Sequence, residues 1–308
     1  MTSPECCGRF DLVDQPEVSA DALTELGAFL RARPTIHQTL GVETTPANKE
    51  ARPDVTMGAT PGTTTRYALA RAQGAPAQDA RIALVLLVGG GGNLKLDDKG
   101  CPQSLWGNVL MRMRPLFHGE GLVTALVDAP SDVPGGDGLA GFRIAPQHAD
   151  DLGRVIGDVR ARTNGSVWLM GHSRGTISAT NGAARLTGPV APDGLVLMSA
   201  MMSGDARARK ALAAQTVFDL RLEAIKMPVL VVGHAADNCV RSPARPMGNI
   251  TARTQGVREQ VATVTGGPIN PARPPVLSAC EGREPHDYVD QESEVAAGIV
   301  RSIRGGRY

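Results

Sequence analysis

The chain has few aromatic residues and no long apolar run. Only 3% of its 308 residues are Phe, Trp or Tyr, which leaves little stacking surface for a large planar ligand. The longest apolar runs, 82–88 and 195–202, are far shorter than the ~18 residues that a membrane-spanning helix needs. These absences exclude a membrane span and favour a small or aliphatic ligand.

The chain also lacks an excess of charge of one sign and lacks metal-binding patterns. The 32 Lys and Arg residues nearly balance the 31 Asp and Glu residues, so no basic field attracts nucleic acid or anionic lipid. No His-x-x-x-His or Cys-x-x-Cys pattern is present, and we expect neither a metal nor an organic cofactor. The sequence therefore predicts small-molecule chemistry without a nucleic-acid or membrane partner, and nothing in it indicates an oligomeric state.

The remaining sequence alternates strand and helix patterns, which predicts an α/β domain. Continuous β-rich runs such as 81–88 are typical of strands buried on both faces, and strands that alternate with helices form a mostly parallel sheet with helices on both faces. The predicted strands are 66–72, 81–88, 122–127, 167–170, 194–199, 227–233 and 260–265. The predicted helices are 146–162, 174–186, 206–225 and 290–303.

The first part of the chain differs from this alternating part. Residues 1–65 are poor in strand signals, apart from an amphipathic segment at 21–33 that predicts an accessory helix. We therefore expect an N-terminal extension over 1–65 and one catalytic domain over 66–308. The segment between the strands 194–199 and 227–233 is too short for a large cap domain.

The segment Gly-His-Ser-Arg-Gly, centred on Ser173, lies between a predicted strand and a predicted helix. This arrangement is typical of a nucleophile elbow, in which a strained backbone lifts the serine hydroxyl clear of the sheet. Glycines at 171 and 175 are required where strand and helix approach closely. A tight turn with an incidental serine is the competing interpretation.

Two later residues fall where the partners of such a serine belong. A serine hydroxyl needs an adjacent base that a third group orients, and in this architecture the chain order is serine, acid, histidine. Asp237 follows the strand 227–233, and His286 precedes the last helix. Of the other histidines, only His234 competes as the base, and it precedes the acid. Taken singly, Asp237 is also compatible with a turn and His286 with the start of a helix.

A glycine run at 89–92 follows the strand 81–88 and supplies a candidate oxyanion hole. Glycines let backbone N–H groups point into a site without obstruction. We expect one donor to be the N–H of Arg174 and the other to be that of Gly90 or Gly91. A phosphate-binding loop is disfavoured because no Gly-Lys-Ser/Thr follows.

These residues resemble the α/β-hydrolase family over 66–303, which implies an α/β-hydrolase fold with little or no cap domain. The elbow around Ser173, the glycine-rich loop, Asp237 and His286 carry the resemblance. The segments 89–94, 128–132, 173–178 and 237–239 also look like those of a poorly characterised bacterial subgroup. Many of its members look exported and carry a cysteine pair near the acid and the histidine.

Cysteine usage bears on the compartment. Cys239 follows the acid and Cys280 shortly precedes the histidine, so a disulfide between these loops is plausible, with two buried thiols as the alternative. The family resemblance favours the disulfide. The first residues lack the features of a secretory signal, which predicts a cytoplasmic protein. A disulfide would instead indicate a periplasmic or secreted protein whose leader is missing from this numbering.

The sequence thus predicts a serine hydrolase, carboxylesterase-like, that cleaves a small or aliphatic ester through an acyl-enzyme intermediate. An acyltransferase or lyase on the same scaffold, or a binding module that retains the fold, are the alternatives. Asn93 and Met201 are predicted to contact the substrate, although a methionine there is also compatible with the core. The Arg174 side chain is expected to pair with a substrate carboxylate or with Asp128 or Asp132.

Overall fold

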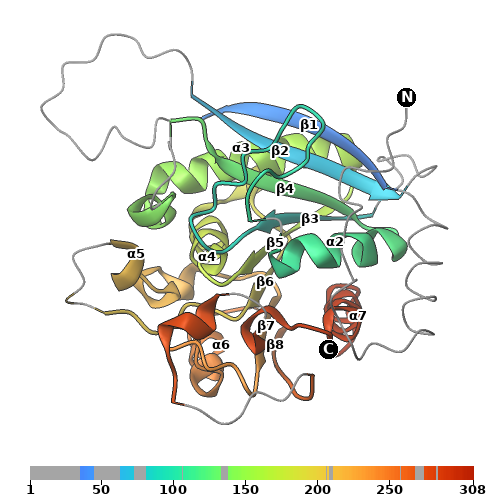
Figure 1. The fold of residues 1–308 in the computed structure, drawn as a ribbon. Coiled ribbons are helices and arrows are strands. Elements are labelled where there is room, and N and C mark those ends of the chain that lie inside the picture. Colours follow the sequence, from blue (N-terminus) through green and yellow to red (C-terminus); the bar gives the residue numbers. More distant parts are fainter. Residues whose placement is uncertain are drawn as a thin grey trace, which may run out of the picture.

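The computed structural model describes residues 35–44, 63–72, 81–105, 107–132, 138–205, 207, 211–256, 258–267, 274–281 and 284–308. Their centre is an eight-stranded sheet in the order β1-β2-β4-β3-β5-β6-β7-β8 (Figure 1). The strands are β1 (Thr35–Thr44), β2 (Thr63–Ala72), β3 (Ile82–Leu87), β4 (Val123–Pro130), β5 (Ser166–His172), β6 (Gly194–Met198), β7 (Val229–His234) and β8 (Glu259–Val264).

Most of the sheet is parallel. Neighbouring strands from β4 through β8 pair in parallel, whereas β2 is antiparallel to both β1 and β4. The carboxyl ends of β3, β5, β6 and β7 therefore meet at one edge of the sheet. Ligand sites of open parallel sheets lie at this edge. The predicted serine, acid and oxyanion-hole residues follow these strands, and the predicted histidine comes after β8.

Helices cover both faces of the sheet (Figure 1). On one face, α3 (Pro146–Thr163) and α4 (Gly175–Arg185) contribute to one buried apolar cluster. On the other, α2 (Val109–Gly119) and α7 (Glu292–Ile303) contribute to a second cluster. The sequence predicted the α/β class and this two-sided cover, and both are confirmed; α2 was not predicted.

The strand β1 corrects the sequence interpretation of the first 65 residues, which found no strand there. It pairs with β2 along its whole length. As an edge strand in an antiparallel pair, β1 needs no continuous apolar run, and its sequence, TIHQTLGVET, is largely polar. The predicted accessory helix at 21–33 lies outside the described residues.

The prediction of a long helix over 206–225 is wrong. The described residues there form α5 (Ala211–Ala214) and two single 3-10 turns, Val217–Asp219 and Leu222–Ala224. Thr216 breaks the helix because it starts a new turn: its hydroxyl accepts from Phe218 N at 3.1 Å, and its N–H donates to Asp219 Oδ2 at 2.7 Å. No helix of more than four residues occurs among the described residues between β6 and β7. The prediction of little or no cap domain is therefore confirmed.

His148, in the first turn of α3, is a buried histidine. Its side chain is packed against the Phe142 ring, with the centroids 5.3 Å apart. Neither ring nitrogen has a partner within the described part of the chain. Burial, followed by the positive charge of Arg143, lowers the pKa of His148 to about 3. The folded protein therefore holds this imidazole neutral at pH values where a free histidine is protonated.

Replacing His148 by phenylalanine is expected to stabilise the protein more at pH 5 than at pH 7.5. As pH falls below ~6.5, the unfolded wild-type chain takes up a proton at this residue that the folded chain does not, so wild-type stability falls. The variant lacks that loss, which amounts to about 2 kcal/mol at pH 5. Urea unfolding at both pH values measures it. All other titrating groups are shared, so an equal effect at both pH values would contradict the assignment.

Candidate active site

Ser173 lies at the turn between β5 and α4 at the carboxyl edge of the sheet. Its φ is +54°, a left-handed conformation that is costly for a residue other than glycine and is found where function demands it. A Cβ on Gly171 would overlap the backbone of Gly175, and a Cβ on Gly175 would overlap the carbonyl of Leu87. The close approach that the elbow motif requires is therefore present on both sides of the serine.

The structure brings Asp237 and His286 together. Asp237, in the loop after β7, accepts a hydrogen bond at 2.8 Å from Nδ1 of His286, and both side chains are only 1% exposed. An Nδ1–H donated to the carboxylate leaves Nε2 as the proton acceptor of the ring. That Nε2 is buried and has no hydrogen-bond partner in the described part of the molecule.

Consecutive residues at the end of β6 anchor the serine and the histidine. Ser173 N donates to Met198 O at 3.0 Å, and the hydroxyl of Ser199 donates to His286 O at 2.9 Å. The ring of His172 lies 5.1 Å from the ring of His286. No hydrogen bond joins Ser173 Oγ to His286 Nε2 in this structure. Such bonds are often long before a substrate is bound and tighten in the complex.

Further buried groups hold the acid and the base, and sequence reasoning missed all of them. The hydroxyl of Ser242 donates to Asp237 Oδ2 at 3.2 Å and lies 3.0 Å from His286 Nδ1. The hydroxyl of Tyr288 accepts from Ser199 N at 3.1 Å, and burial raises the pKa of that tyrosine. Only Ser199 carried a signal in the sequence, since it is the last residue of the predicted strand 194–199.

Arg143 positions the glycine-rich loop after β3. It is 2% exposed, and its Nη2 donates to the carbonyls of Val88 and Gly90, both at 3.2 Å. In a planar trans peptide the N–H points away from the C=O. The N–H groups of Gly89 and Gly91 therefore point away from the guanidinium. Sequence reasoning did not identify this arginine.

Gly89 is the glycine of this loop that contacts the nucleophile. A Cβ added there would lie 2.8 Å from Ser173 Cβ and 3.3 Å from Ser173 Oγ, whereas a Cβ on Gly90 would meet a leucine side chain. The N–H groups of Gly89, Gly90, Gly91 and Arg174 have no acceptor among the described residues. The loop thus offers unpaired donors beside the hydroxyl, and Gly89 joins the predicted Gly90 and Gly91 as a candidate.

Asp128, at the end of β4, fixes the chain that continues from the glycine-rich loop. Its carboxylate accepts backbone N–H groups from Leu94 at 2.6 Å, Lys95 at 3.2 Å, Leu96 at 2.8 Å and Ala129 at 2.8 Å. The carboxylate is therefore fully engaged with the backbone. The predicted ion pair between Arg174 and Asp128 is absent among the described residues, and so is a pair between Arg174 and Asp132.

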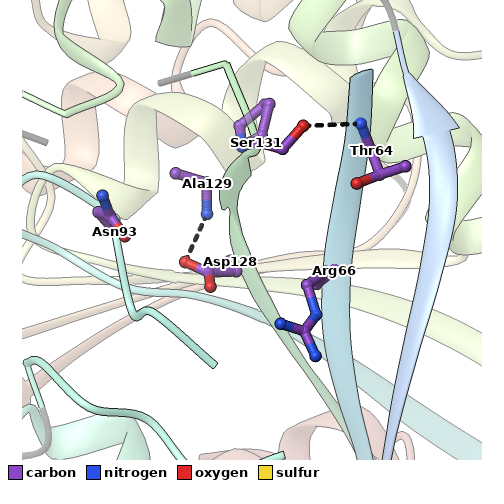
Figure 2. A pocket seen from close by; sticks show the side chains of 7 residues that line it. Thr64, Arg66, Asn93, Asp128, Ala129 and Ser131 are labelled. Atoms are coloured by element: carbon purple, nitrogen blue, oxygen red, sulfur yellow. Dashed lines mark hydrogen bonds between the residues drawn. The ribbon is translucent and has the colours of Figure 1, made fainter. Parts of the chain in front are cut away.

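Asn93 lines a polar pocket of about 220 Å³ beside this loop. Figure 2 shows Asp128 between Asn93 and Arg66, and it shows Ser131 accepting the N–H of Thr64. The lining residues are Thr64, Arg66, Asn93, Asp128, Ala129, Pro130 and Ser131. Ser173, Asp237 and His286 are not among them, and the contact of Asn93 with the substrate stays a prediction.

Met201 lies in the apolar core. It is 2% exposed and belongs to the cluster on the α3 and α4 face of the sheet. Its backbone N–H donates to the hydroxyl of Thr176 at 3.1 Å. This placement corrects the prediction of a substrate contact, because the side chain packs against other core residues. The sequence had left a core position as the alternative for this methionine, and a core position is the commoner role for a methionine after a strand.

Cys239 and Cys280 form a disulfide that joins the acid loop to the loop before the histidine. The N–H of Cys239 also donates to Asp237 Oδ1 at 2.8 Å. Ligand atoms of Asp237, Cys239 and His286 lie within 4.8 Å of one another. However, the sulfur of Cys239 is bonded to Cys280 in the disulfide, and Nδ1 of His286 is hydrogen-bonded to the carboxylate of Asp237. This donor set does not fit a metal ion.

Replacing both Cys239 and Cys280 by serine is expected to lower the free energy of unfolding by about 4 kcal/mol, because a loop of 41 residues loses its cross-link. At low temperature, where the variant is still folded, it should keep most of its activity, since Asp237 and His286 keep their own hydrogen bond. Denaturant unfolding and esterase assays on the same preparation compare the two effects. A variant as stable as wild type would contradict the expected contribution of the cross-link.

No protein-family model matches the sequence, and no curated protein matches it. Solved structures do match in fold. A soluble variant of monoglyceride lipase from Saccharomyces cerevisiae is 10% identical, with a TM-score of 0.53 over 82% of this chain and 95% of that chain. Est1E from Butyrivibrio proteoclasticus is 12% identical, with a TM-score of 0.51 over 79% of this chain and 93% of that chain. None of the described helices is both long and apolar enough to span a bilayer.

Proposed function

Because the chain has the α/β-hydrolase fold, we propose that it is a serine hydrolase that cleaves a carboxylic ester through an acyl-enzyme intermediate. Ser173 is the nucleophile, His286 the general base and acid, and Asp237 the carboxylate that orients the imidazole. The observation that carries the proposal is the buried pair of Asp237 and His286 at 2.8 Å, with the ring nitrogen Nε2 left without a partner.

In the first half-reaction Ser173 Oγ bonds to the acyl carbon while its proton moves to His286 Nε2. The carbonyl oxygen becomes an oxyanion, which N–H groups of the glycine-rich loop and of Arg174 stabilise. Removing one such donor typically costs about 10²–10³ in kcat. The bond from the acyl carbon to the alcohol oxygen then breaks, and His286 returns its proton to that oxygen.

In the second half-reaction water replaces the alcohol. His286 takes a proton from the water, whose oxygen bonds to the acyl carbon, and the bond to Ser173 Oγ breaks as the serine recovers its proton. The products are one carboxylic acid and one alcohol. A small or aliphatic acyl group is favoured because aromatic residues make up only 3% of the chain.

The disulfide between Cys239 and Cys280 supports a location in an oxidising compartment over the cytoplasmic alternative. Disulfides form and persist outside the reducing cytosol in most organisms. In this proposal the bond keeps the two loops that carry Asp237 and His286 together.

A fluorophosphonate probe and a panel of p-nitrophenyl esters of graded acyl length test the function. We expect covalent labelling of the peptide that contains Ser173, detected by mass spectrometry, and release of p-nitrophenol with one equivalent of acid. A protein that neither reacts with the probe nor releases p-nitrophenol would be a binding module instead. Acyl transfer to an added alcohol that exceeds hydrolysis would favour the acyltransferase alternative.

A further inference from the structure

Three arginines, Arg174, Arg143 and Arg241, make no ion pair with a carboxylate among the residues that the structure describes. Arg174 directly follows Ser173, is half-buried, and makes no ion pair or side-chain hydrogen bond in the described part of the chain. Arg143, beneath the glycine-rich loop, donates only to carbonyl oxygens and to the hydroxyl of Ser178 at 2.7 Å. Arg241, in the loop after the acid, has no carboxylate among its hydrogen-bond partners either.

The guanidinium of Arg241 is hydrogen-bonded only to backbone carbonyls in the part of the chain that the structure describes. Its guanidinium donates to the carbonyl of Ala213 and, at 3.2 Å, to that of Gln215. Its Nε is buried and has no partner among the described residues. Backbone carbonyls satisfy some N–H groups of a guanidinium but leave its charge unneutralised.

Besides burial, the positive charge of Arg174 lowers the pKa of both Arg143 and Arg241. Burial comes first among the causes that lower the pKa of Arg143 to about 9, and the charge of Arg174 comes next. The same two causes, in the same order, lower the pKa of Arg241, which only the exposed Asp205 opposes. Arg174 therefore lies within electrostatic reach of both guanidinium groups.

The carboxylates of the site do not neutralise this group. Asp128 is bonded to backbone N–H groups, and Asp237 is bonded to His286, to Ser242 and to a backbone N–H. Neither pairs with a guanidinium. The half-buried guanidinium of Arg174, which has no partner in the described part of the molecule, is the feature that the contacts above leave unexplained.

We propose that the Arg174 side chain binds a carboxylate of the substrate, so that the preferred ester carries an anionic group a few bonds from the scissile bond. This inference rests on the proposed function and names its substrate class. A guanidinium matches a carboxylate bidentately, and Arg143 and Arg241 strengthen the attraction through their charges. The neutral ester of the same length lacks this interaction.

A matched pair of substrates tests the proposal: p-nitrophenyl hydrogen adipate, which carries a free carboxylate, and p-nitrophenyl methyl adipate, its neutral twin. The readout is the ratio of kcat/KM for the anionic ester to that for the neutral ester, at low ionic strength. We expect a ratio of about tenfold or more in the wild type, because hydrogen bonds to charged groups contribute strongly. Added NaCl should lower the ratio.

Variants assign the preference to one residue. In Arg174→Gln the ratio should fall close to one, and Arg174→Lys should keep part of it. Arg301→Gln is the matched control: it removes the same charge from an exposed position near the end of α7, and the wild-type ratio should persist. α7 begins after His286 at the site, so its far end lies toward the opposite edge of the sheet.

The outcomes separate this inference from the proposed function. If the wild type hydrolyses neither adipate ester nor any other ester of the panel, the hydrolase proposal fails. If it hydrolyses both adipate esters with a ratio of one or less, only the carboxylate preference is overturned. An Arg174→Gln variant with the wild-type ratio, or an Arg301→Gln variant that loses it, would overturn the assignment to Arg174.

Discussion

Replacing Ser173 by alanine is expected to reduce kcat/KM for p-nitrophenyl esters by at least about 10⁴-fold. Without the hydroxyl no acyl enzyme forms, and His286 is left only with water to activate. The residual rate would come from the N–H groups of the glycine-rich loop and from substrate binding. Steady-state hydrolysis and loss of fluorophosphonate labelling measure the change.

Ser166 provides the control for this substitution. It lies at the start of β5, at the opposite end of the strand from the elbow, and its hydroxyl donates to Arg81 O at 3.1 Å. Ser166→Ala makes the same chemical change in the same strand and should leave hydrolysis close to the wild-type rate. A Ser173→Ala protein that is folded and keeps more than a tenth of the wild-type kcat/KM would remove this serine from the mechanism.

Replacing Asp237 by asparagine is expected to cost about 10⁴-fold in kcat. The carboxylate accepts the Nδ1 proton of His286 at 2.8 Å. An amide nitrogen at the same position would donate to Nδ1, so the ring proton would move to Nε2 and the ring would lose its acceptor for the serine proton. The shape of the site is preserved while the tautomer of the base is wrong.

The comparison with Ser242→Ala separates the tautomer from packing. The Ser242 hydroxyl contacts the same carboxylate at 3.2 Å, but its removal leaves the Nδ1 proton on the Asp237 side. We expect a loss of about tenfold or less, because the carboxylate keeps its hydrogen bonds to His286 and to the N–H of Cys239. Unfolding experiments on both variants check that the fold is intact. A tenfold or smaller loss in Asp237→Asn would show that this carboxylate does not orient the base.

The sequence was most informative where local pattern and burial agree. The strands β3, β5 and β7 are continuous apolar runs because they are covered on both faces. The elbow has a local signature because sterics at a strand-to-helix turn restrict it to small residues. Ser173, Asp237 and His286 could be chosen by chain order, since each lies within a few residues of the end of a predicted strand or the start of a predicted helix.

The rest depends on contacts between distant segments. Arg143 and Val88 are 55 residues apart, and a buried arginine contradicts the hydropathy by which core residues are recognised. Ser242 and Tyr288 lie in loops, whose sequences lack the hydrophobic periodicity by which helices and strands are recognised. The edge strand β1 was missed because a strand with one neighbour can remain polar, and its pairing with β2 is a tertiary property.

The four backbone N–H groups that Asp128 binds have a consequence for protein engineering. A loop held through its main chain keeps its path when its side chains change. Residue 93 can therefore be randomised in a library to alter what the pocket that it lines accepts. Asp128 itself should stay fixed, because its substitution would release the backbone of the loop in every member of the library.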